Sequence, residues 1–288
     1  MIDVGPKVRV DKYLLELHPE LNRSEITRLI KQNNLKINGQ KSLKTAFKIS
    51  PENDLIELNI PAIKIVKYTD QVPATLFEDD NVLILDKPAG MLVHAKGKIP
   101  NEKTLLDFIK PKLNFPEVNN RTGIVHRLDR ATSGVIITAK NAATLKFLQK
   151  QFESRKVIKK YLAVIKGSID PKEGEIDMPI QRNPKRPQTF RVHNAGKSAM
   201  TSYRILKEGN SNSLLELSPK TGRTHQLRVH LKAIGHPIVG DYLYNEITSD
   251  SRMMLHASEL SIRLPGENQL RTFKSKTPSE FNKLVSKQ

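Results

Sequence analysis

The chain has 288 residues, enough for one large or two ordinary domains with a sizeable core. Its 48 Lys and Arg against 30 Asp and Glu give a formal net charge of +18, which favours a polyanionic partner, most simply nucleic acid. The absence of cysteine excludes disulfides and thiolate zinc sites. No run of eighteen apolar residues and no signal peptide is found, so we expect a cytoplasmic protein with no membrane segment.

Two short helices are predicted near the N-terminus. Residues 10–17 have an amphipathic pattern, and Ser24 can cap a second helix over residues 25–32. The outward face of the second helix is basic through Arg23, Arg28 and Lys31. A basic helix face suits RNA, and the alternative is a small capping domain with a solvated face.

A small hairpin follows these helices. Residues 35–37 alternate like a strand, Asn38-Gly39 predicts a tight turn, and residues 55–60 resume the strand pattern. Residues 60–72 then read as a linker. We place the first domain at residues 1–62, a linker at 63–73, and a second domain at 74–288.

The second domain mixes strand and helix patterns without regular β-α-β repeats. Helix patterns follow Thr104 and Asn141, while strand patterns fall at residues 82–86, 159–165, 198–205, 213–217 and 253–262. This mixture predicts an α+β fold with a mostly antiparallel mixed sheet.

An acid lies between arginines in the passage His126-Arg127-Leu128-Asp129-Arg130-Ala131-Thr132-Ser133-Gly134. Apolar strand-like runs flank the passage, so Asp129 is predicted on a loop that a rigid scaffold holds, where catalytic groups tend to lie. Taken alone, Asp129 could equally be a turn residue paired with Arg127 or Arg130.

A basic segment without any acid spans residues 181–204. Its cations are Arg182, Lys185, Arg186, Arg191, Lys197 and Arg204. Pro, Asn and Gly residues predict an extended loop or ribbon, and Phe190 and His193 could stack on nucleotides. A solvated basic loop is the alternative, although such stretches usually have an anionic partner.

A second unusual motif begins at Thr221, and from about Thr224 it reads as a helix. Arg223 at the helix entrance is unfavourable for the helix dipole, so we expect it to have a specific anionic partner. The carboxylate of Asp129 would suit it through two parallel hydrogen bonds, which would keep the acid ionised. A phosphate contact or a structural ion pair is the alternative for Arg223.

The histidines and carboxylates show no spacing typical of a metal site, so no metal is expected. An RNA-cleaving enzyme with His126 or His225 as acid and base is disfavoured for the same reason, because it would need paired histidines or a metal.

Four motifs together resemble the RluA-type pseudouridine synthases. They are His126-Arg127-Leu128-Asp129 with Thr132-Ser133-Gly134, Lys87-Pro88-Ala89-Gly90 with Val93-His94, Lys160-Tyr161-Leu162-Ala163, and Gly222-Arg223-Thr224-His225-Gln226-Leu227-Arg228. Residues 9–39 are similar to the S4 RNA-binding domain that precedes the catalytic domain in the large-subunit rRNA members. The resemblance covers nearly the whole chain.

The resemblance implies the pseudouridine synthase fold and isomerisation of uridine to pseudouridine in RNA, without cofactor or metal. It implies that Asp129 is essential, by attack or by deprotonation, with Arg223 as its salt-bridge partner. Tyr161 would lie against the uracil and could transfer a proton. Arg127 would enter the space left by the flipped nucleotide. Further RNA contacts are predicted at Lys87, His126, Arg182, Arg186, Arg23, Arg28 and Lys31, with structural roles as the alternative for Lys87.

The S4-like module favours large-subunit (23S) ribosomal RNA, or an assembling ribosomal subunit, as the substrate, because it adds a second anchor. A tRNA target is the alternative within the family. A non-catalytic RNA-binding protein of ribosome assembly is the alternative outside it. We expect a monomer.

Overall fold

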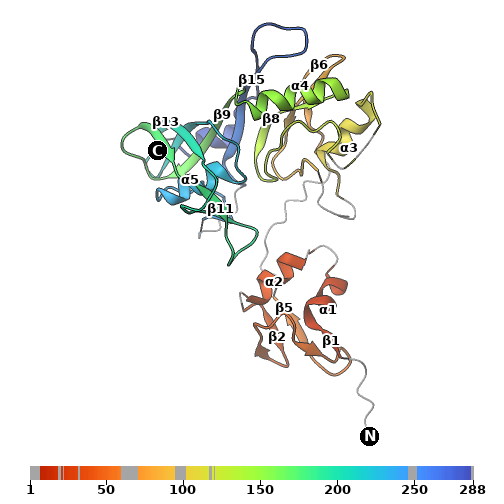
Figure 1. The fold of residues 1–288 in the computed structure, drawn as a ribbon. Coiled ribbons are helices and arrows are strands. Elements are labelled where there is room, and N and C mark those ends of the chain that lie inside the picture. The colour runs from red at the N-terminus through yellow and green to blue at the C-terminus, as the bar shows by residue number, and fades with distance from the viewer. Residues whose placement is uncertain are drawn as a thin grey trace. The chain divides into compact units, whose positions relative to one another are not determined.

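The computed structural model in Figure 1 describes residues 7–18, 21, 23–31, 33–59, 71–94, 102–116, 119, 121–245 and 252–286. The chain forms two compact units, Met1–Ile65 and Val66–Gln288, each with its own core. Most of the predicted linker at residues 63–73 lies outside the described residues. No helix in the described part of the chain is long and apolar enough to cross a membrane.

The first unit is two helices and short strands around one apolar core. In chain order its elements are β1 (Val8–Arg9), α1 (Val10–Leu17), α2 (Arg23–Lys31), β2 (Leu35–Ile37), β3 (Gln40–Lys41), β4 (Lys48–Ile49) and β5 (Ile56–Leu58). Strand β2 pairs with both β3 and β5, and β1 pairs with β4, all antiparallel. The turn between β2 and β3 has positive φ at Asn38 (51°) and Gly39 (77°), as the Asn-Gly pair predicts.

Helix α1 has the predicted bounds, whereas α2 begins at Arg23, two residues before its predicted start. Ser24 therefore lies within the helix by its backbone and not at the position before it; assigned helix ends commonly differ by one or two residues. The buried side chains of both helices face the strands, among them Leu14, Ile26 and Ile30.

The second unit is built on one large mixed sheet. In chain order its elements are β6 (Ala74–Glu78), β7 (Val82–Lys87), α3 (Leu105–Ile109), the short 3-10 helix η1 (Lys110–Lys112), β8 (Ser133–Ala139), α4 (Ala142–Glu153), β9 (Ile158–Lys166), β10 (Glu173–Asp177), β11 (Ile180–Arg182), β12 (Phe190–Val192), β13 (Met200–Glu208), β14 (Asn212–Pro219), α5 (Gln226–Ala233), β15 (Leu255–Ile262), β16 (Arg271–Lys274) and α6 (Ser279–Lys283).

The strand order in this sheet is β10-β13-β14-β9-β15-β8-β7-β6, with β16 also paired to β15. The pairs are antiparallel except β15 with β8, which is parallel. Strands β11 and β12 form a separate two-stranded ribbon, as the composition of residues 181–204 predicts. The predicted α+β fold with a mostly antiparallel mixed sheet is confirmed.

Strands β7 and β8 bury both of their faces, because alternate residues face opposite sides of a sheet. Ile84 and Ile137 pack in the cluster that contains Leu148 of α4, while Leu85 and Ile136 pack in the cluster of α3. Figure 1 shows α4 lying along β8. Each helix is capped as predicted, α4 by Asn141 and α3 by a capping box at Thr104.

Candidate active site

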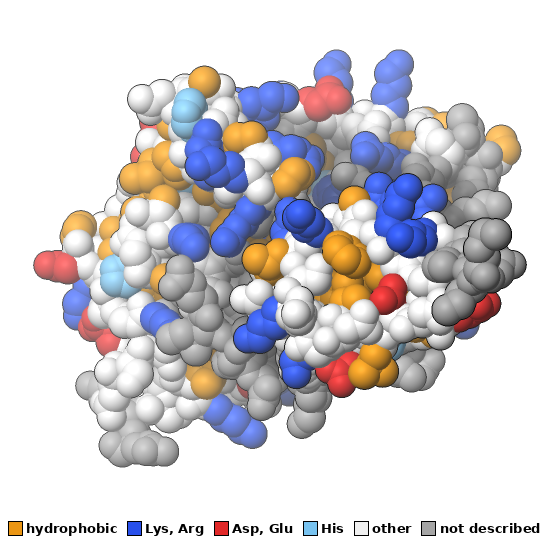
Figure 2. Space-filling view, turned by 90° about the horizontal axis from the view of Figure 1, so that it is seen from below, with side chains coloured by type: hydrophobic (Ala, Val, Ile, Leu, Met, Phe, Trp, Pro, Cys, Tyr) orange, Lys and Arg blue, Asp and Glu red, His pale blue; other side chains and the backbone are white. Residues whose placement is uncertain are grey.

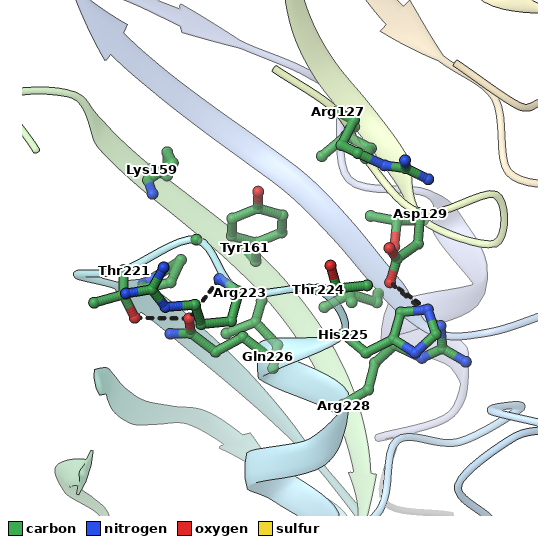
Figure 3. Close-up of a pocket in the computed structure, with 16 residues that line it drawn as sticks. Arg127, Asp129, Lys159, Tyr161, Thr221, Arg223, Thr224, His225, Gln226 and Arg228 are labelled. Atoms are coloured by element: carbon green, nitrogen blue, oxygen red, sulfur yellow. Dashed lines mark hydrogen bonds and ion pairs between the residues drawn. The ribbon is translucent and has the colours of Figure 1, made fainter. Parts of the chain in front are cut away.

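A pocket of about 150 Å³ opens where four segments of the second unit meet. The loop before β8 contributes Asp129, the start of β9 contributes Tyr161, and the loop before α5 contributes Arg223. The first turns of α5 contribute Arg228. Figure 3 shows these side chains converging on one space. The sequence motifs around Asp129, Tyr161 and Arg223 thus come together although nearly a hundred residues separate the first from the last.

The loop that carries Asp129 is fixed by backbone contacts. The Thr132 amide donates to the Asp129 carbonyl at 3.1 Å, and the Gly90 amide donates to the Arg130 carbonyl at 2.7 Å. Gly134, at φ +110°, ends the loop where β8 meets β15, and a Cβ there would lie 2.1 Å from the Ala257 carbonyl oxygen. The motif therefore needs its glycine for the approach of two strands.

Lys87 is completely buried and binds the loop that carries Asp129 through the Arg130 carbonyl. Its Nζ donates to the carbonyls of Pro88 (2.8 Å), Met91 (2.9 Å) and Arg130 (3.2 Å), and burial lowers its pKa to about 7. The prediction that Lys87 contacts RNA is wrong, because all three of its hydrogens are used inside the protein. The alternative, a structural role, is what the structure shows.

Arg228 is the cation that faces Asp129. Its Nη1 donates to Asp129 Oδ2 at 3.2 Å, while Nε and Nη2 each donate at 2.7 Å to the two oxygens of Asp241. The Arg228 side chain is 3% exposed, Asp241 is fully buried, and Asp129 is 20% exposed. Burial by itself lowers the pKa of Arg228, but the hydrogen bonds and charge of Asp241 and the charge of Asp129 raise it above its ordinary value. Arg228 therefore stays charged beside the acid.

The prediction that Arg223 pairs with Asp129 is wrong. Arg223 lines the pocket, but its Nε donates to the Ser198 carbonyl at 3.0 Å. The physical reason is that α5 begins at Gln226 rather than near Thr224, so Arg223 lies on the preceding loop. The predicted helix entrance was misplaced by about two residues, and the cation that the helix directs at the acid is Arg228.

Gln226 pins this loop to the sheet. Its Oε1 accepts from the Arg223 amide (3.0 Å) and from Thr221 Oγ1 (2.7 Å), and its Nε2 donates to the Met200 carbonyl (2.9 Å). Because Gln226 is buried, these bonds fix the pocket wall on which Arg223 lies.

His225 is a further neighbour of Asp129 and has an unusual backbone. Its φ of 58° is in the left-handed region, which a non-glycine residue adopts at a cost and often at a functional site. Its Nε2 lies 3.8 Å from Asp129 Oδ2 and its Nδ1 lies 2.8 Å from the Tyr244 hydroxyl. Burial lowers the pKa of His225 to about 4, against the raising effect of Asp129, so the ring is neutral at pH 7.

Tyr161 and Lys159 lie on the pocket wall formed by β9. Burial and the charge of Asp129 raise the pKa of the Tyr161 phenol well above its usual value. Burial lowers the pKa of Lys159, which makes no ion pair within the described part of the chain. Tyr161 thus presents a neutral phenol to the pocket beside a cation that the sequence motifs did not single out.

Arg127 is exposed at the pocket edge, whereas His126 is only partly exposed and does not line the pocket. The His126 ring stacks on Phe152 with centroids 4.6 Å apart, and its Nε2 accepts from the Ile137 amide at 3.2 Å. Burial lowers its pKa to about 3. These contacts show that the His126 ring supports the loop, and the predicted RNA contact of His126 stays a prediction. The same burial argues against His126 as an acid in RNA cleavage.

The predicted RNA-contacting cations of the ribbon are exposed. Arg182 and Arg186 lie on or beside β11, and the Arg182 guanidinium lies 5.0 Å from the centre of the Phe190 ring. In the first unit Arg23 and Lys31 are exposed on α2, while the side chain of Arg28 lies outside the description. Figure 2 shows Lys and Arg side chains spread over the face in view, more widely than the Asp and Glu side chains.

The described residues contain no group of three or more His, Asp or Glu placed to hold a metal ion. What they do contain is one carboxylate held by a buried cation in a pocket rich in further cations. This arrangement is a candidate active site with a positively charged lining, which suits an anionic substrate.

Comparison with known proteins gives the family. The model of the RNA pseudouridylate synthases matches residues 81–233, which is more than half of the chain, and the S4 domain model matches residues 8–56. A ribosomal large subunit pseudouridine synthase D from Borreliella burgdorferi is 38% identical over 289 residues, covering 95% of this chain and 87% of that protein. One from Nitrosomonas europaea is 33% identical, covering 96% and 83%.

Comparison with solved structures points to the same family. Human RNA pseudouridylate synthase domain containing 1 superposes with a TM-score of 0.60 at 28% identity, covering 72% of this chain and 84% of that one. The chain belongs to the RNA pseudouridylate synthase family, with an N-terminal S4 domain. It is an isomerase that converts uridine to pseudouridine in RNA, which confirms the resemblance seen in the motifs.

Proposed function

We propose that Asp129 is the essential catalytic residue and that the enzyme acts on large-subunit (23S) ribosomal RNA. The observation that carries the first part is the contact of Asp129 with Arg228, a buried cation that Asp241 fixes from its other side. The guanidinium 3.2 Å away pairs with the Asp129 carboxylate and holds it in the pocket, and both attack and deprotonation would use this carboxylate.

The two oxygens of Asp129 have different surroundings. Arg228 and His225 both face Oδ2, whereas Oδ1 accepts no hydrogen bond within the described part of the chain. Oδ1 is thus the oxygen available to the substrate. In the reaction the bond from uracil N1 to the ribose breaks, a bond from C5 to the same ribose carbon forms, and the C5 proton is lost while N1 gains one. Asp129 either attacks the sugar or removes a proton, and its position serves both routes.

Tyr161 lies against the uracil in this proposal. Its raised pKa keeps the phenol protonated at neutral pH, so it can donate a hydrogen bond to the base and act as an acid. It becomes a base for the C5 proton only after its own proton has moved. Stacking on the ring and hydrogen bonding at its edge are compatible roles.

Arg127 lies at the pocket edge, where a nucleotide must leave its helix to enter. We assign it to the space that the flipped nucleotide vacates. Arg223 is exposed to the same pocket on the opposite wall and suits a phosphate contact, which was the alternative for it from the sequence.

The substrate assignment depends on the S4 domain and the relatives. Residues 1–62 serve as an RNA-binding domain through Arg23, Arg28 and Lys31, residues 63–73 serve as a linker, and residues 74–288 are the catalytic domain. The ribbon cations Arg182 and Arg186 add contacts to the RNA backbone. The relatives named above act on the large ribosomal subunit, and this chain covers most of their length. We propose that it acts as a monomer in the cytoplasm.

Mapping of pseudouridines in ribosomal and transfer RNA from a deletion strain tests the proposal. We expect one or more large-subunit sites to be lost and restored by the wild-type gene but not by an Asp129→Ala gene. Loss confined to tRNA would replace the substrate assignment, and restoration by Asp129→Ala would remove the catalytic one. Purified protein should convert the same uridines without added metal.

A further inference from the structure

Tyr244 lies outside every motif that the sequence analysis described, yet it contacts two residues of the active site, His225 and Arg228. It follows α5 by eleven residues and is 5% exposed. Its hydroxyl oxygen accepts from the Phe190 amide at 2.8 Å and lies 2.8 Å from Nδ1 of His225. The ring packs with Val229 of α5 and Ile180 of the ribbon in one apolar cluster.

The hydrogen-bond partners of the Tyr244 hydroxyl favour one tautomer of His225. The hydroxyl has one hydrogen, and within the described residues His225 Nδ1 is the acceptor within reach of it. Nδ1 therefore accepts, and the proton of the neutral ring lies on Nε2. Nε2 is the nitrogen that faces Asp129 Oδ2 at 3.8 Å. The other tautomer would direct a lone pair at a carboxylate oxygen and would leave the tyrosine hydrogen without an acceptor.

The same residue also contacts the second group that faces this oxygen. The Arg228 guanidinium lies over the Tyr244 ring, with Cζ 5.0 Å from its centre, and the ring of His225 meets the Tyr244 ring edge-on at 5.6 Å. The Tyr244 amide donates to Asp241 Oδ1 at 3.3 Å, and Asp241 holds Arg228. One residue thus touches the three groups that position the charge on Asp129.

We propose that Tyr244 is a positioning residue of the active site, which holds the neutral His225 ring with Nε2 directed toward Asp129 Oδ2, 3.8 Å away, beside the Arg228 cation that binds the same oxygen. The proposal rests on the catalytic role proposed for Asp129. In this arrangement Oδ2 is the stabilised oxygen, and Oδ1 is kept for the substrate. Because the Phe190 amide is the other partner of the hydroxyl, the first residue of β12, next to the loop that joins β11 and β12, is tied to the same point.

The decisive variant is Tyr244→Phe, which keeps the ring over Arg228 and removes only the hydroxyl. We expect kcat to fall by about tenfold with little change in KM, since positioning acts on the chemical step. Tyr203→Phe is the matched control, because it removes a tyrosine hydroxyl that donates to the Pro171 carbonyl, away from the pocket. It should leave kcat unchanged.

Two further measurements separate positioning from a structural effect. In a double-mutant cycle, Tyr244→Phe should have little effect on kcat when His225 is already alanine. In the wild-type protein, the ¹⁵N shifts of the His225 ring should show a protonated Nε2 and an unprotonated Nδ1, and this result does not depend on the folding of a variant.

A protonated Nδ1 in the wild type, an unchanged kcat in Tyr244→Phe, or an equal loss in the His225→Ala background would each overturn the inference. These outcomes leave the role of Asp129 intact if Asp129→Asn is inactive. If Asp129→Asn is active, the proposed catalytic role fails first, which makes the two failures distinguishable.

Discussion

Replacement of Arg228 by glutamine should remove catalysis and stability together, for two separable reasons. The first is the loss of the cation beside Asp129. The second is that Asp241, which is fully buried, would keep its charge without its partner. Arg223→Gln is the matched control, because Arg223 lines the same pocket but donates to a backbone carbonyl instead of Asp129.

The magnitudes follow from the distances. Breaking a buried pair with two 2.7 Å hydrogen bonds is expected to lower the free energy of unfolding by about 3–5 kcal/mol. Two unit charges 3.2 Å apart attract by about 5 kcal/mol at an effective dielectric of about 20. Water reaches the partly exposed Asp129 and offsets part of the lost attraction. We therefore expect the activation free energy to rise by about half of the 5 kcal/mol. That corresponds to about a hundredfold lower kcat.

The assay compares kcat from single-turnover pseudouridine formation with unfolding free energy from urea titration. A double variant, Arg228→Gln with Asp241→Asn, removes both buried charges and should regain most of the stability while staying inactive. Arg223→Gln should change kcat by less than about threefold and act mainly on KM. Equal loss of kcat in Arg223→Gln, or recovery of activity in the double variant, would refute the assignment of Arg228.

Three other changes have defined outcomes. Tyr161→Phe should lower kcat by about a hundredfold with RNA affinity retained, since the ring still stacks; an unchanged kcat would leave Tyr161 a stacking role only. Arg182→Ala with Arg186→Ala should reduce the slope of log affinity against log salt by about two, measured by filter binding between low and moderate salt; an unchanged slope would exclude the ribbon from the RNA contact. His126 is neutral when folded, with a pKa of about 3 against about 6.5 unfolded, so the unfolded chain binds the proton first as pH falls. Stability should therefore drop by about 2 kcal/mol between pH 7 and pH 5, and His126→Gln should flatten that profile in urea titrations; an equally steep profile would contradict it.

The sequence predicted the fold class and the position of the acid because both depend on local patterns. Apolar runs on either side of residues 126–134 predicted two strands. The later run forms β8, with the acid on the loop just before it, whereas the earlier run forms only an isolated bridge at Ile124. The Asn38-Gly39 turn and the cap at Asn141 depend on backbone conformation and hydrogen bonding within a few residues, so they too were predictable.

The partner of Asp129 was not predictable in this way. Arg223 and Arg228 lie in the same motif, and the choice between them depends on where α5 begins and on Asp241, which binds Arg228 from a later loop. Because α5 begins at Gln226, Arg228 lies in its first turn and faces Asp129. The burial of Lys87 could not be predicted either, because a basic residue in a motif looks the same in the sequence whether it faces RNA or the core.

Release of tritium from RNA labelled at C5 of uridine tests the role of Asp129 most directly, because formation of pseudouridine requires loss of the C5 hydrogen. Wild-type protein should release tritium from large-subunit RNA, while Asp129→Asn should bind the same RNA with similar affinity and release none. Release by Asp129→Asn at a rate near that of the wild type would contradict a mechanism that depends on this carboxylate.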